Sequence, residues 1–486
     1  MPVITSIDDL KRMHRAHTPR MFYDYAESGS YTEQTFRENT TDFQKIRLRQ
    51  KVAVDMSNRS LARDIVGLPV SMPVGLAPVG LTGMQRADGE IKAARAAEAF
   101  GVPFCLSTMS ICSIEDVAGH TTAPFMFQLY VMRDQDFLAA IIDRAKRANC
   151  SALVLTLDLQ ILGQRHKDLK NGLSAPPKFT LPTLMNLATK LRWGSEMART
   201  KRRFFGNIVG HAKGVTDAGN LAAWTAEQFD TQLDWTKIAA IRDMWGGKLI
   251  LKGILDADDA RKAADFGADA IVVSNHGGRQ LDGALSSIRM LPEIVAAVGD
   301  RVEVHMDSGI RSGQDVLKAL ALGAHATWIG RAWLHGLGAM GQPGVTAALD
   351  VIRKELDVTM ALCGERDIRN VGRHNVLVPA EWGRDYVCRS DLAQERQQVA
   401  VHLVRVRRQH PVRRAVIFDV ARLWQQLRQP QPGRLVRHVL VGGAVQDQRG
   451  AGNRVHIGGE IGQAERVHAG KRGDGARLHG HAPGPV

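Results

Sequence analysis

The 486-residue chain has no run of 18 apolar residues, and this absence excludes a membrane-spanning helix. Its first 20 residues are polar and charged without an apolar core, so we expect no signal peptide. The five cysteines form no CxxC pair and no metal-ligand spacing, which favours a reducing compartment and predicts no metal site. No GxGxxG motif follows an expected strand, which argues against a Rossmann nicotinamide site.

Positive charge is distributed unevenly along the chain. The net charge is +14, but the segment 381–486 holds 17 Arg and 1 Lys against 9 acidic residues, a net charge of +9. The other 380 residues therefore carry only +5. The basic isoelectric point is thus a property of the last 106 residues and says little about the partners of the preceding chain.

The segment 381–486 also differs from the rest of the chain in using Arg almost to the exclusion of Lys. We predict a frame-shifted or misread extension of a GC-rich gene, or a disordered tail, because out-of-frame GC-rich codons yield Arg but little Lys. The alternative is a basic tail that binds nucleic acid or anionic lipid. We expect no nucleic-acid partner, because only four aromatic side chains could stack on bases: Trp382, Tyr386, Phe418 and Trp424.

Eight short apolar runs alternate with helix-like stretches, and each run ends in polar or Gly-rich sequence. Strand and helix repeated eight times predict an α/β fold, a (β/α)8 TIM barrel over residues 1–380. The alternative is an open doubly wound sheet. The expected strands are 73–77, 102–106, 125–130, 153–157, 249–252, 270–273, 302–306 and 326–329.

The interval between the fourth and fifth expected strands is a long insertion of about 90 residues. Its segment at about 175–215 mixes apolar and basic side chains, such as Leu191 and Trp193 beside Lys190 and Arg192. At a membrane interface, cations meet anionic lipids and aromatic rings enter the headgroup region. We therefore expect peripheral membrane contact, and the alternative is an active-site lid with a solvated basic face.

Candidate catalytic groups follow the sixth expected strand, in the stretch Ser274 to Asp282. His276 can take a proton near neutral pH, and Arg279 can bind a carboxylate through two parallel hydrogen bonds. Parallel barrels place catalytic groups at the carboxyl ends of their strands. A base beside a carboxylate-binding cation predicts chemistry next to a carboxylate, as in a 2-hydroxy acid. Two glycines between them would let the backbone approach a flat ligand.

Other strand ends offer polar groups to the same rim. Gln128 and Tyr130 lie two residues apart and so share a face, as do Thr156 and Asp158. We expect Asp158 to orient His276 and stabilise its charged form. Further along the chain, Arg165 could be a second carboxylate donor and Lys252 a fixed cation for a reduced cofactor.

Gly-rich loops after the seventh and eighth expected strands predict a phosphate site, because many barrels bind phosphate there at helix N-termini. The residues concerned are Asp307, Gly309, Arg311, Gly330 and Arg331. The two arginines supply positive charge, and Asp307 could accept from a ribose or ribityl hydroxyl.

These motifs together resemble the FMN-dependent 2-hydroxy acid dehydrogenases and oxidases, with the bacterial respiratory L-lactate dehydrogenases as the nearest branch. The resemblance runs from about Met1 to Pro379. It rests on Tyr23-Asp24-Tyr25, Ala77 to Gly80, Phe127 to Tyr130, Leu157-Asp158, Lys252 to Ile254, Ser274 to Asp282, Asp307 to Arg311 and Gly330-Arg331.

The resemblance implies a role for each site residue. FMN would lie on Ala77, Pro78 and Val79, with Ser107, Gln128, Thr156, Lys252 and Ser274 around the flavin, Asp307 at the ribityl chain, and Gly309, Arg311, Gly330 and Arg331 at the phosphate. The substrate carboxylate would meet Arg165 and Arg279, aided by Tyr25. Tyr130 would bond the substrate hydroxyl, and His276, paired with Asp158, would take the proton.

The resemblance also implies partners. The substrate would be a small L-2-hydroxy acid, foremost L-lactate, and the acceptor a quinone or other respiratory carrier at the cytoplasmic face of the inner membrane. Met109 stands where oxygen-using members often have Trp, which favours the respiratory branch. The alternatives are a soluble oxidase producing hydrogen peroxide, a dehydrogenase for a larger acid such as mandelate, and a barrel that binds without turnover. A homo-oligomer, a tetramer, is expected by the same analogy.

Overall fold

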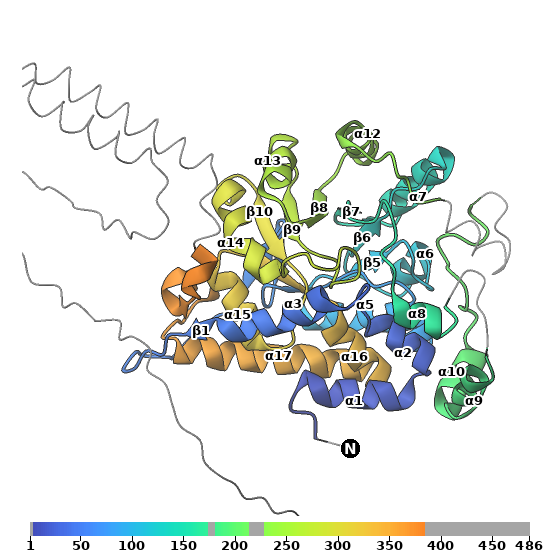
Figure 1. Cartoon of the computed structure of the whole chain (residues 1–486), viewed down its shortest axis with the longest axis horizontal. Coiled ribbons are helices and arrows are strands. Elements are labelled where there is room, and N and C mark those ends of the chain that lie inside the picture. Colours follow the sequence, from blue (N-terminus) through green and yellow to red (C-terminus); the bar gives the residue numbers. More distant parts are fainter. Residues whose placement is uncertain (1–2, 174–179, 213–227, 384–486) are drawn as a thin grey trace, which may run out of the picture. The chain divides into compact units, whose positions relative to one another are not determined.

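A parallel sheet of eight strands forms the centre of the described chain, in the order β4-β11-β10-β9-β8-β7-β6-β5 (Figure 1). A parallel bridge between Leu76 and Phe104 joins its two end strands and closes the barrel. Every strand overlaps one expected apolar run, so the predicted (β/α)8 fold is confirmed. The strands are β4 (Val74–Leu76), β5 (Cys105–Ser107), β6 (Met126–Leu129), β7 (Leu153–Thr156), β8 (Leu249–Ile254), β9 (Ala270–Val273), β10 (Glu303–Met306) and β11 (Ala326–Ile329).

The strands are continuous apolar runs because both of their faces are covered. All four residues of β7 and all four of β9 are buried. Side chains on one face fill the barrel interior, and those on the other pack under the surrounding helices. The carboxyl ends of the parallel strands consequently meet at one rim, where the polar groups named above collect.

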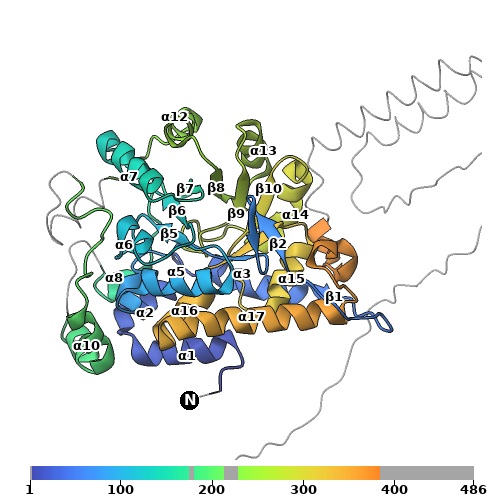
Figure 2. The ribbon, with the colours of Figure 1, turned by 180° about the vertical axis from the view of Figure 1, so that it is seen from behind.

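Helices surround the barrel, as Figures 1 and 2 show from opposite sides. Side-chain caps fix several of their starts; for example, Asp134 accepts a hydrogen bond from the Phe137 amide at the start of α7. The surrounding helices are α4 (Thr82–Gln85), α5 (Gly89–Phe100), α6 (Ile114–Ala118), α7 (Gln135–Arg147), α12 (Trp235–Trp245), α13 (Ala257–Asp265), α14 (Ser287–Val298), α15 (Gly313–Ala321), α16 (Arg331–Met340) and α17 (Gln342–Leu362).

The N-terminal segment adds three helices and the first half of a small sheet. The helices are α1 (Ile7–His17), α2 (Arg20–Ala26) and α3 (Gln34–Lys45). Strand β1 (Arg47–Leu48) pairs antiparallel with β12 (Val376–Leu377), and β2 (Arg63–Ile65) forms a hairpin with β3 (Leu68–Val70). Both ends of the barrel chain are therefore tied together by β1 and β12.

The computed structural model describes residues 3–173, 180–212 and 228–383. All of them belong to one compact unit spanning residues 1–398. The tail predicted at 381–486 lies almost wholly outside the described residues, so its origin stays a prediction. Within the described ranges no helix is both long and apolar enough to cross a membrane.

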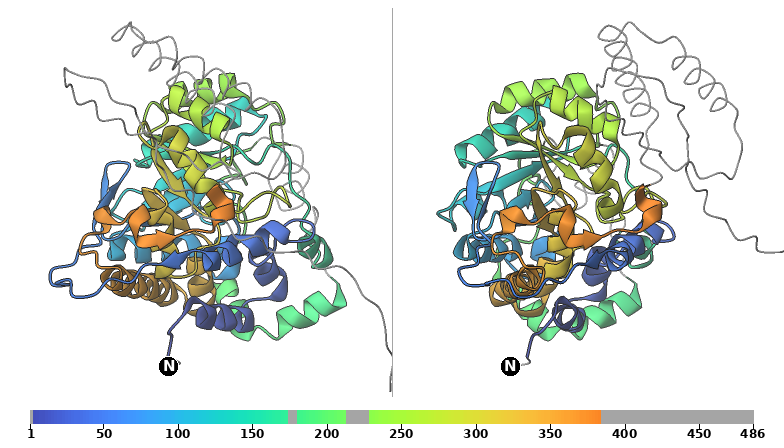
Figure 3. Two further views of the ribbon diagram at one scale, coloured as in Figure 1. Left: turned by 60° about the vertical axis from the view of Figure 1, so that its left-hand side comes forward. Right: turned by 90° about the vertical axis from the view of Figure 1, so that its left-hand side faces the viewer.

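The long insertion between β7 and α12 contributes the helices α8 (His166–Lys170), α9 (Leu181–Ala188) and α10 (Leu191–Arg199). No side chain of α9 or α10 is fully buried. These two helices lie at the edge of the molecule beside α1 and α2, away from the sheet (Figure 3). Trp193 of α10 nevertheless contacts the rest of the protein, because its indole nitrogen donates to the carbonyl oxygen of Met84 at 2.8 Å.

Helices α16 and α17 cross at two glycines that touch back to back. A Cβ at Gly336 would lie 2.2 Å from the carbonyl oxygen of Gly344, and a Cβ at Gly344 would lie 1.9 Å from that of Gly336. The backbones can approach this closely only because neither residue has a side chain.

We therefore expect Gly344→Ala to lower the free energy of unfolding by about 1–3 kcal/mol, the usual effect of overpacking. Thermal unfolding followed by circular dichroism measures the change. Gly194→Ala is the matched control, because the site in α10 is open and the added methyl group meets nothing within 4 Å. Equal melting temperatures for the two variants would contradict this account of the crossing.

Candidate active site

A cavity lies at the carboxyl ends of the strands, and fifteen of the nineteen predicted site residues line it. Its lining includes side chains from the segment before β4, Lys252 from within β8, and residues from the loops after the other seven strands of the barrel. The fifteen are Tyr25, Ala77, Pro78, Val79, Tyr130, Thr156, Arg165, Lys252, His276, Arg279, Asp307, Gly309, Arg311, Gly330 and Arg331.

The other four predicted residues lie one contact behind this lining. Gln128 donates from Nε2 to the Thr156 hydroxyl at 3.0 Å and accepts at Oε1 from the Ser107 hydroxyl at 3.0 Å. Ser274 accepts from Lys252 Nζ at 2.9 Å, and Asp158 contacts His276. Ser107 and Gln128 are also paired in the β5–β6 register, which accounts for their contact.

His276 is held between Asp158 and Tyr130. Its Nδ1 lies 2.9 Å from Asp158 Oδ1, and its Nε2 lies 3.4 Å from the Tyr130 hydroxyl. The imidazole and phenol rings are nearly parallel, at an angle of 17°. Because Asp158 accepts the Nδ1 proton, Nε2 is the nitrogen left to take a proton in the cavity.

The electrostatics favour a neutral histidine beside a charged aspartate. Burial lowers the pKa of His276, although Asp158 acts to raise it. Burial raises the pKa of Asp158, but the attraction of His276 and Lys252 outweighs it and leaves that pKa below its usual value. His276 is therefore unprotonated at neutral pH and can act as a base, and Asp158 stabilises the imidazolium once it forms.

The loop that carries His276 has a left-handed backbone. His276 itself has φ +57°, followed by Gly277 and Gly278 at +70° and +73°. A Cβ at Gly278 would lie 2.5 Å from the backbone of Phe36 in α3. The missing side chain at Gly278 therefore makes room for α3, whereas Gly277 lines the cavity; the close approach of this backbone to a flat ligand stays a prediction.

Two arginines, with a tyrosine ring between them, make one side of the cavity cationic. The guanidinium carbons of Arg279 and Arg165 lie 4.7 Å and 6.0 Å from the centre of the Tyr25 ring. Burial and the charge of Arg165 lower the pKa of Arg279. Asp168 pairs with Arg165 at 2.6 Å. One carboxylate thus lies close to two cations, so the two arginines can also bind the carboxylate of a ligand.

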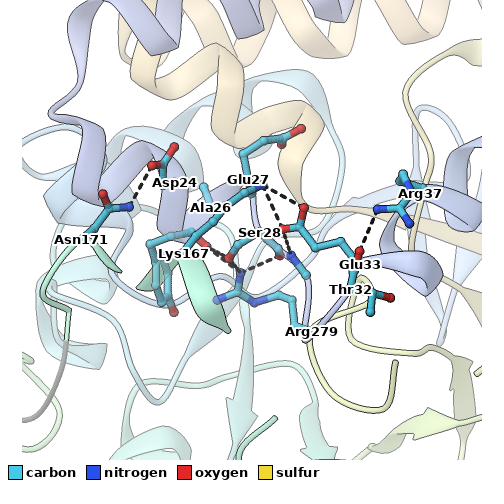
Figure 4. A network of polar contacts seen from close by, with 12 residues as sticks. Asp24, Ala26, Glu27, Ser28, Thr32, Glu33, Arg37, Lys167, Asn171 and Arg279 are labelled. Carbon is cyan, nitrogen blue, oxygen red and sulfur yellow. Dashed lines mark hydrogen bonds and ion pairs between the residues drawn. The ribbon is translucent and has the colours of Figure 1, made fainter. Parts of the chain in front are cut away.

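The N-terminal segment fixes Arg279 in place, as the network in Figure 4 shows. Its Nη1 donates to the carbonyl oxygens of Tyr25 and Ser28 at 2.5 and 3.2 Å, and to the Ser28 hydroxyl at 3.2 Å. Lys167 donates to the Glu27 carbonyl oxygen and to the Glu33 carboxylate, both at 3.0 Å. Residues 25–33 thus tie the loop after β7 to the loop after β9.

A buried ion pair connects the ends of β8, β9 and β10. Lys252 Nζ lies 3.0 Å from Asp307 Oδ2, and the Ser308 hydroxyl donates to Asp307 at 2.8 Å. Burial acts to lower the pKa of Lys252, but Asp307 and Asp158 raise it above its usual value. Lys252 therefore stays charged in the interior of the rim.

The cavity lining also includes two half-buried guanidinium groups, those of Arg311 and Arg331. Burial lowers the pKa of both, and burial together with the charge of Arg311 lowers that of Arg331 to about 9. Glu27 provides a carboxylate 3.8 Å from Arg331. A methyl group at Gly330 would meet nothing within 4 Å, so the loop leaves open space beside the arginines. Positive charge with free space is suited to an anionic group.

The sequence interpretation did not assign roles to several residues of the cavity. Apolar side chains close the side near His276, and Phe229 packs edge-on against Tyr130 with ring centres 5.8 Å apart. Phe229 is brought there by an antiparallel bridge to Met132 after the long insertion. No local pattern signals such a return. The apolar lining includes Met109, Leu159, Leu162, Phe205, Phe229 and Trp328.

Comparisons with known proteins agree with this geometry. Residues 14–378 match the model of the FMN-dependent dehydrogenase family. The chain is 45% identical over 375 residues to an L-lactate dehydrogenase of Caulobacter vibrioides (strain NA1000 / CB15N), which covers 76% of this chain and 96% of that protein. It is 43% identical over 370 residues to an L-lactate dehydrogenase of Ectopseudomonas mendocina (strain ymp), covering 76% and 97%.

Among solved structures, the chain is similar to a monotopic membrane protein, (S)-mandelate dehydrogenase. The TM-score is 0.74 with 35% sequence identity, and the match covers 78% of this chain and 100% of the other. The unmatched part of this chain accords with the extra residues after 378.

Asp158→Asn should lower the pKa of His276, because the variant removes the carboxylate that stabilises the imidazolium. Nuclear magnetic resonance of labelled histidine side chains, titrated with pH, measures the change. Asp168→Asn serves as the control, since that carboxylate pairs with Arg165 instead. An unchanged His276 pKa in Asp158→Asn would show that the pair does not interact as described.

Proposed function

Because the chain belongs to the FMN-dependent dehydrogenase family, we propose that it oxidises L-lactate to pyruvate and passes the electrons to a membrane quinone. Family membership supports FMN-dependent oxidation of a 2-hydroxy acid, and the similarity to several L-lactate dehydrogenases supports L-lactate as the particular substrate. The observation that carries the proposal is the His276–Asp158 pair, of which His276 lines the same cavity as Arg165 and Arg279.

The residues present fit FMN. The open space beside Gly330 and the positive charges of Arg311 and Arg331 suit its phosphate. Burial, with the charge of Arg311 adding to it, lowers the pKa of Arg331 to about 9, and a bound anion would offset both effects. Gly309 and Asp307 would lie along the ribityl chain. Around the flavin we place the backbone of Ala77 to Val79 and the side chains of Ser107, Gln128, Thr156, Lys252 and Ser274. When bound, FMN accepts the two electrons that leave the substrate.

The protein's own groups would bind the substrate and move one proton. Arg165 and Arg279, with Tyr25 between them, would hold the carboxylate in a fixed orientation. The Tyr130 hydroxyl lies 3.4 Å from His276 Nε2, so both can reach one substrate hydroxyl group. Burial raises the pKa of Tyr130, which keeps it a neutral donor. His276 Nε2 would take the proton, and Asp158 would stabilise the resulting imidazolium.

Exposed apolar side chains on the insertion support the membrane part of the proposal. Leu181, Leu184 and Met185 on α9 are between 50 and 71% exposed, and Leu191 at the start of α10 is 81% exposed. Lys190 precedes Leu191 directly in the sequence, and Arg192 follows it. Apolar side chains beside cations suit the interface of an anionic membrane. The similar (S)-mandelate dehydrogenase is described as a monotopic membrane protein.

A second candidate substrate is a larger acid such as mandelate. The similarity to (S)-mandelate dehydrogenase favours it, and the flexible Met109 in the cavity wall could accommodate either side chain. Initial rates with L-lactate and (S)-mandelate, each with a soluble quinone and with oxygen as acceptor, separate these possibilities. A higher kcat/KM for (S)-mandelate would overturn the choice of lactate, and equal rates with oxygen would overturn that of quinone.

His276→Gln should lower kcat by at least about 100-fold, because it removes the proton acceptor. The bound flavin, measured by its absorbance after gel filtration, should be retained, since the predicted phosphate-binding arginines are unchanged. His120→Gln is the control, because His120 is an exposed histidine outside the cavity. Substantial activity in His276→Gln would exclude this histidine as the base.

The double substitution Leu184→Gln and Leu191→Gln should lower binding to vesicles of anionic phospholipid at least about tenfold, because it removes two exposed apolar side chains. Co-sedimentation measures the bound fraction. Val358→Gln with Leu362→Gln is the control, since both residues are similarly exposed but lie on α17. Equal binding by both double variants would refute a membrane role for α9 and α10.

A further inference from the structure

Strand β8 carries an irregularity beside the catalytic pair. Lys252 pairs with Val272 and Ile254 with Val273, so the register with β9 shifts across Gly253. Gly253 has φ +101°, a conformation that L side chains rarely adopt. The bulge lies next to the end of β7, where the Leu157 amide donates to the Lys252 carbonyl oxygen at 2.9 Å.

Asp158 packs directly onto this bulge. A Cβ at position 253 would lie 2.7 Å from Cγ of Asp158, 2.8 Å from its Cβ and 3.1 Å from its backbone nitrogen. Contacts under 3.0 Å do not occur between such atoms, so a side chain at Gly253 would have to move the Asp158 side chain. The atoms in the way are Cβ and Cγ of Asp158, which cannot move aside as the end of a long flexible side chain could.

The carboxylate of Asp158 has few other constraints. Oδ1 meets His276 at 2.9 Å, whereas Oδ2 is buried and has no hydrogen-bond partner among the described residues. The backbone is held separately, because Gln280 Nε2 donates to the Asp158 carbonyl oxygen at 2.6 Å. The distance between the Asp158 carboxyl group and His276 therefore depends on packing, and the residue against which the Asp158 side chain packs is Gly253.

We propose that Gly253 is a positioning residue for the reaction: the absence of a side chain at the β8 bulge lets Asp158 lie within hydrogen-bond reach of His276. This inference rests on the proposed function for its effect on turnover. Gly253 acts only through Asp158 and does not need to touch the substrate.

Gly253→Ala should weaken the Asp158–His276 contact and so lower the pKa of His276, in the same direction as Asp158→Asn. The pKa should fall by about 1, and kcat should fall about 10- to 100-fold. Histidine resonances titrated in the flavin-loaded protein measure the pKa, with the His276 signal assigned by its loss in His276→Gln. The pKa measurement needs no turnover, so it remains informative if the protein oxidises no 2-hydroxy acid.

Two comparisons separate positioning from simple backbone strain. Gly246→Ala is the matched control, because Gly246 also has a positive φ, +68°, but nothing lies within 4 Å of an added methyl group. It should leave the His276 pKa and kcat unchanged. In the Asp158→Asn background, Gly253→Ala should change neither value further, because the interaction it disturbs is already lost. Additive effects, or a normal His276 pKa in Gly253→Ala, would overturn the proposal.

If Gly253→Ala does not accumulate as folded protein, a second variant decides. The double substitution Gly253→Ala with Asp158→Gly removes the side-chain atoms that the methyl group would meet. Recovery of folded, flavin-loaded protein would show that Asp158 is the obstacle, as proposed. Continued failure to fold, with Gly246→Ala folding normally, would mean that Gly253 is required by the backbone alone, and the proposal would be wrong.

Discussion

The ion pair between Lys252 and Asp307 is the interaction on which the rim of the barrel depends. An ammonium group buried among strand ends requires a carboxylate partner, and Asp307 supplies it at 3.0 Å from the next strand but one. The hydroxyl of Ser274, the first residue after the strand between, accepts from the same ammonium group. Three consecutive strand ends are thereby fixed, and the loops that follow them carry His276, Arg279 and Arg311. The charge of Lys252 also reaches Asp158 and helps keep that carboxyl ionised.

Much of the fold could be predicted because the eight strands are short apolar runs with polar ends. β9 and β11 occupy 270–273 and 326–329, as expected, and α5 occupies 89–100. Burial on both faces makes such runs visible without any knowledge of the partner strands. The site was predictable for a related reason. Polar residues at or just after the carboxyl ends of parallel strands share one rim, so His276, Lys252 and Thr156 converge whatever the helices do.

Other features depend on contacts that a linear pattern does not contain. Phe229 reaches the cavity after a long insertion, through a bridge to Met132. Glu27 comes from the N-terminal segment and lies 3.8 Å from Arg331, more than 300 residues away in sequence. Trp193 lies in a segment whose composition suits a membrane interface. Its ring nevertheless contacts Phe22, and its indole nitrogen donates to the carbonyl oxygen of Met84. The bulge at Gly253 is equally hidden, because only the neighbouring Asp158 shows why a side chain would not fit there.

The central claim is that one cavity holds FMN beside a base and a carboxylate-binding pair of arginines, so that a 2-hydroxy acid reduces the flavin directly. The most direct test is to mix the purified protein with L-lactate in the absence of oxygen and follow the visible absorbance of the flavin. The account predicts rapid bleaching, with pyruvate formed in an amount equal to the flavin. A flavin that stays oxidised with L-lactate and with every other 2-hydroxy acid would contradict it.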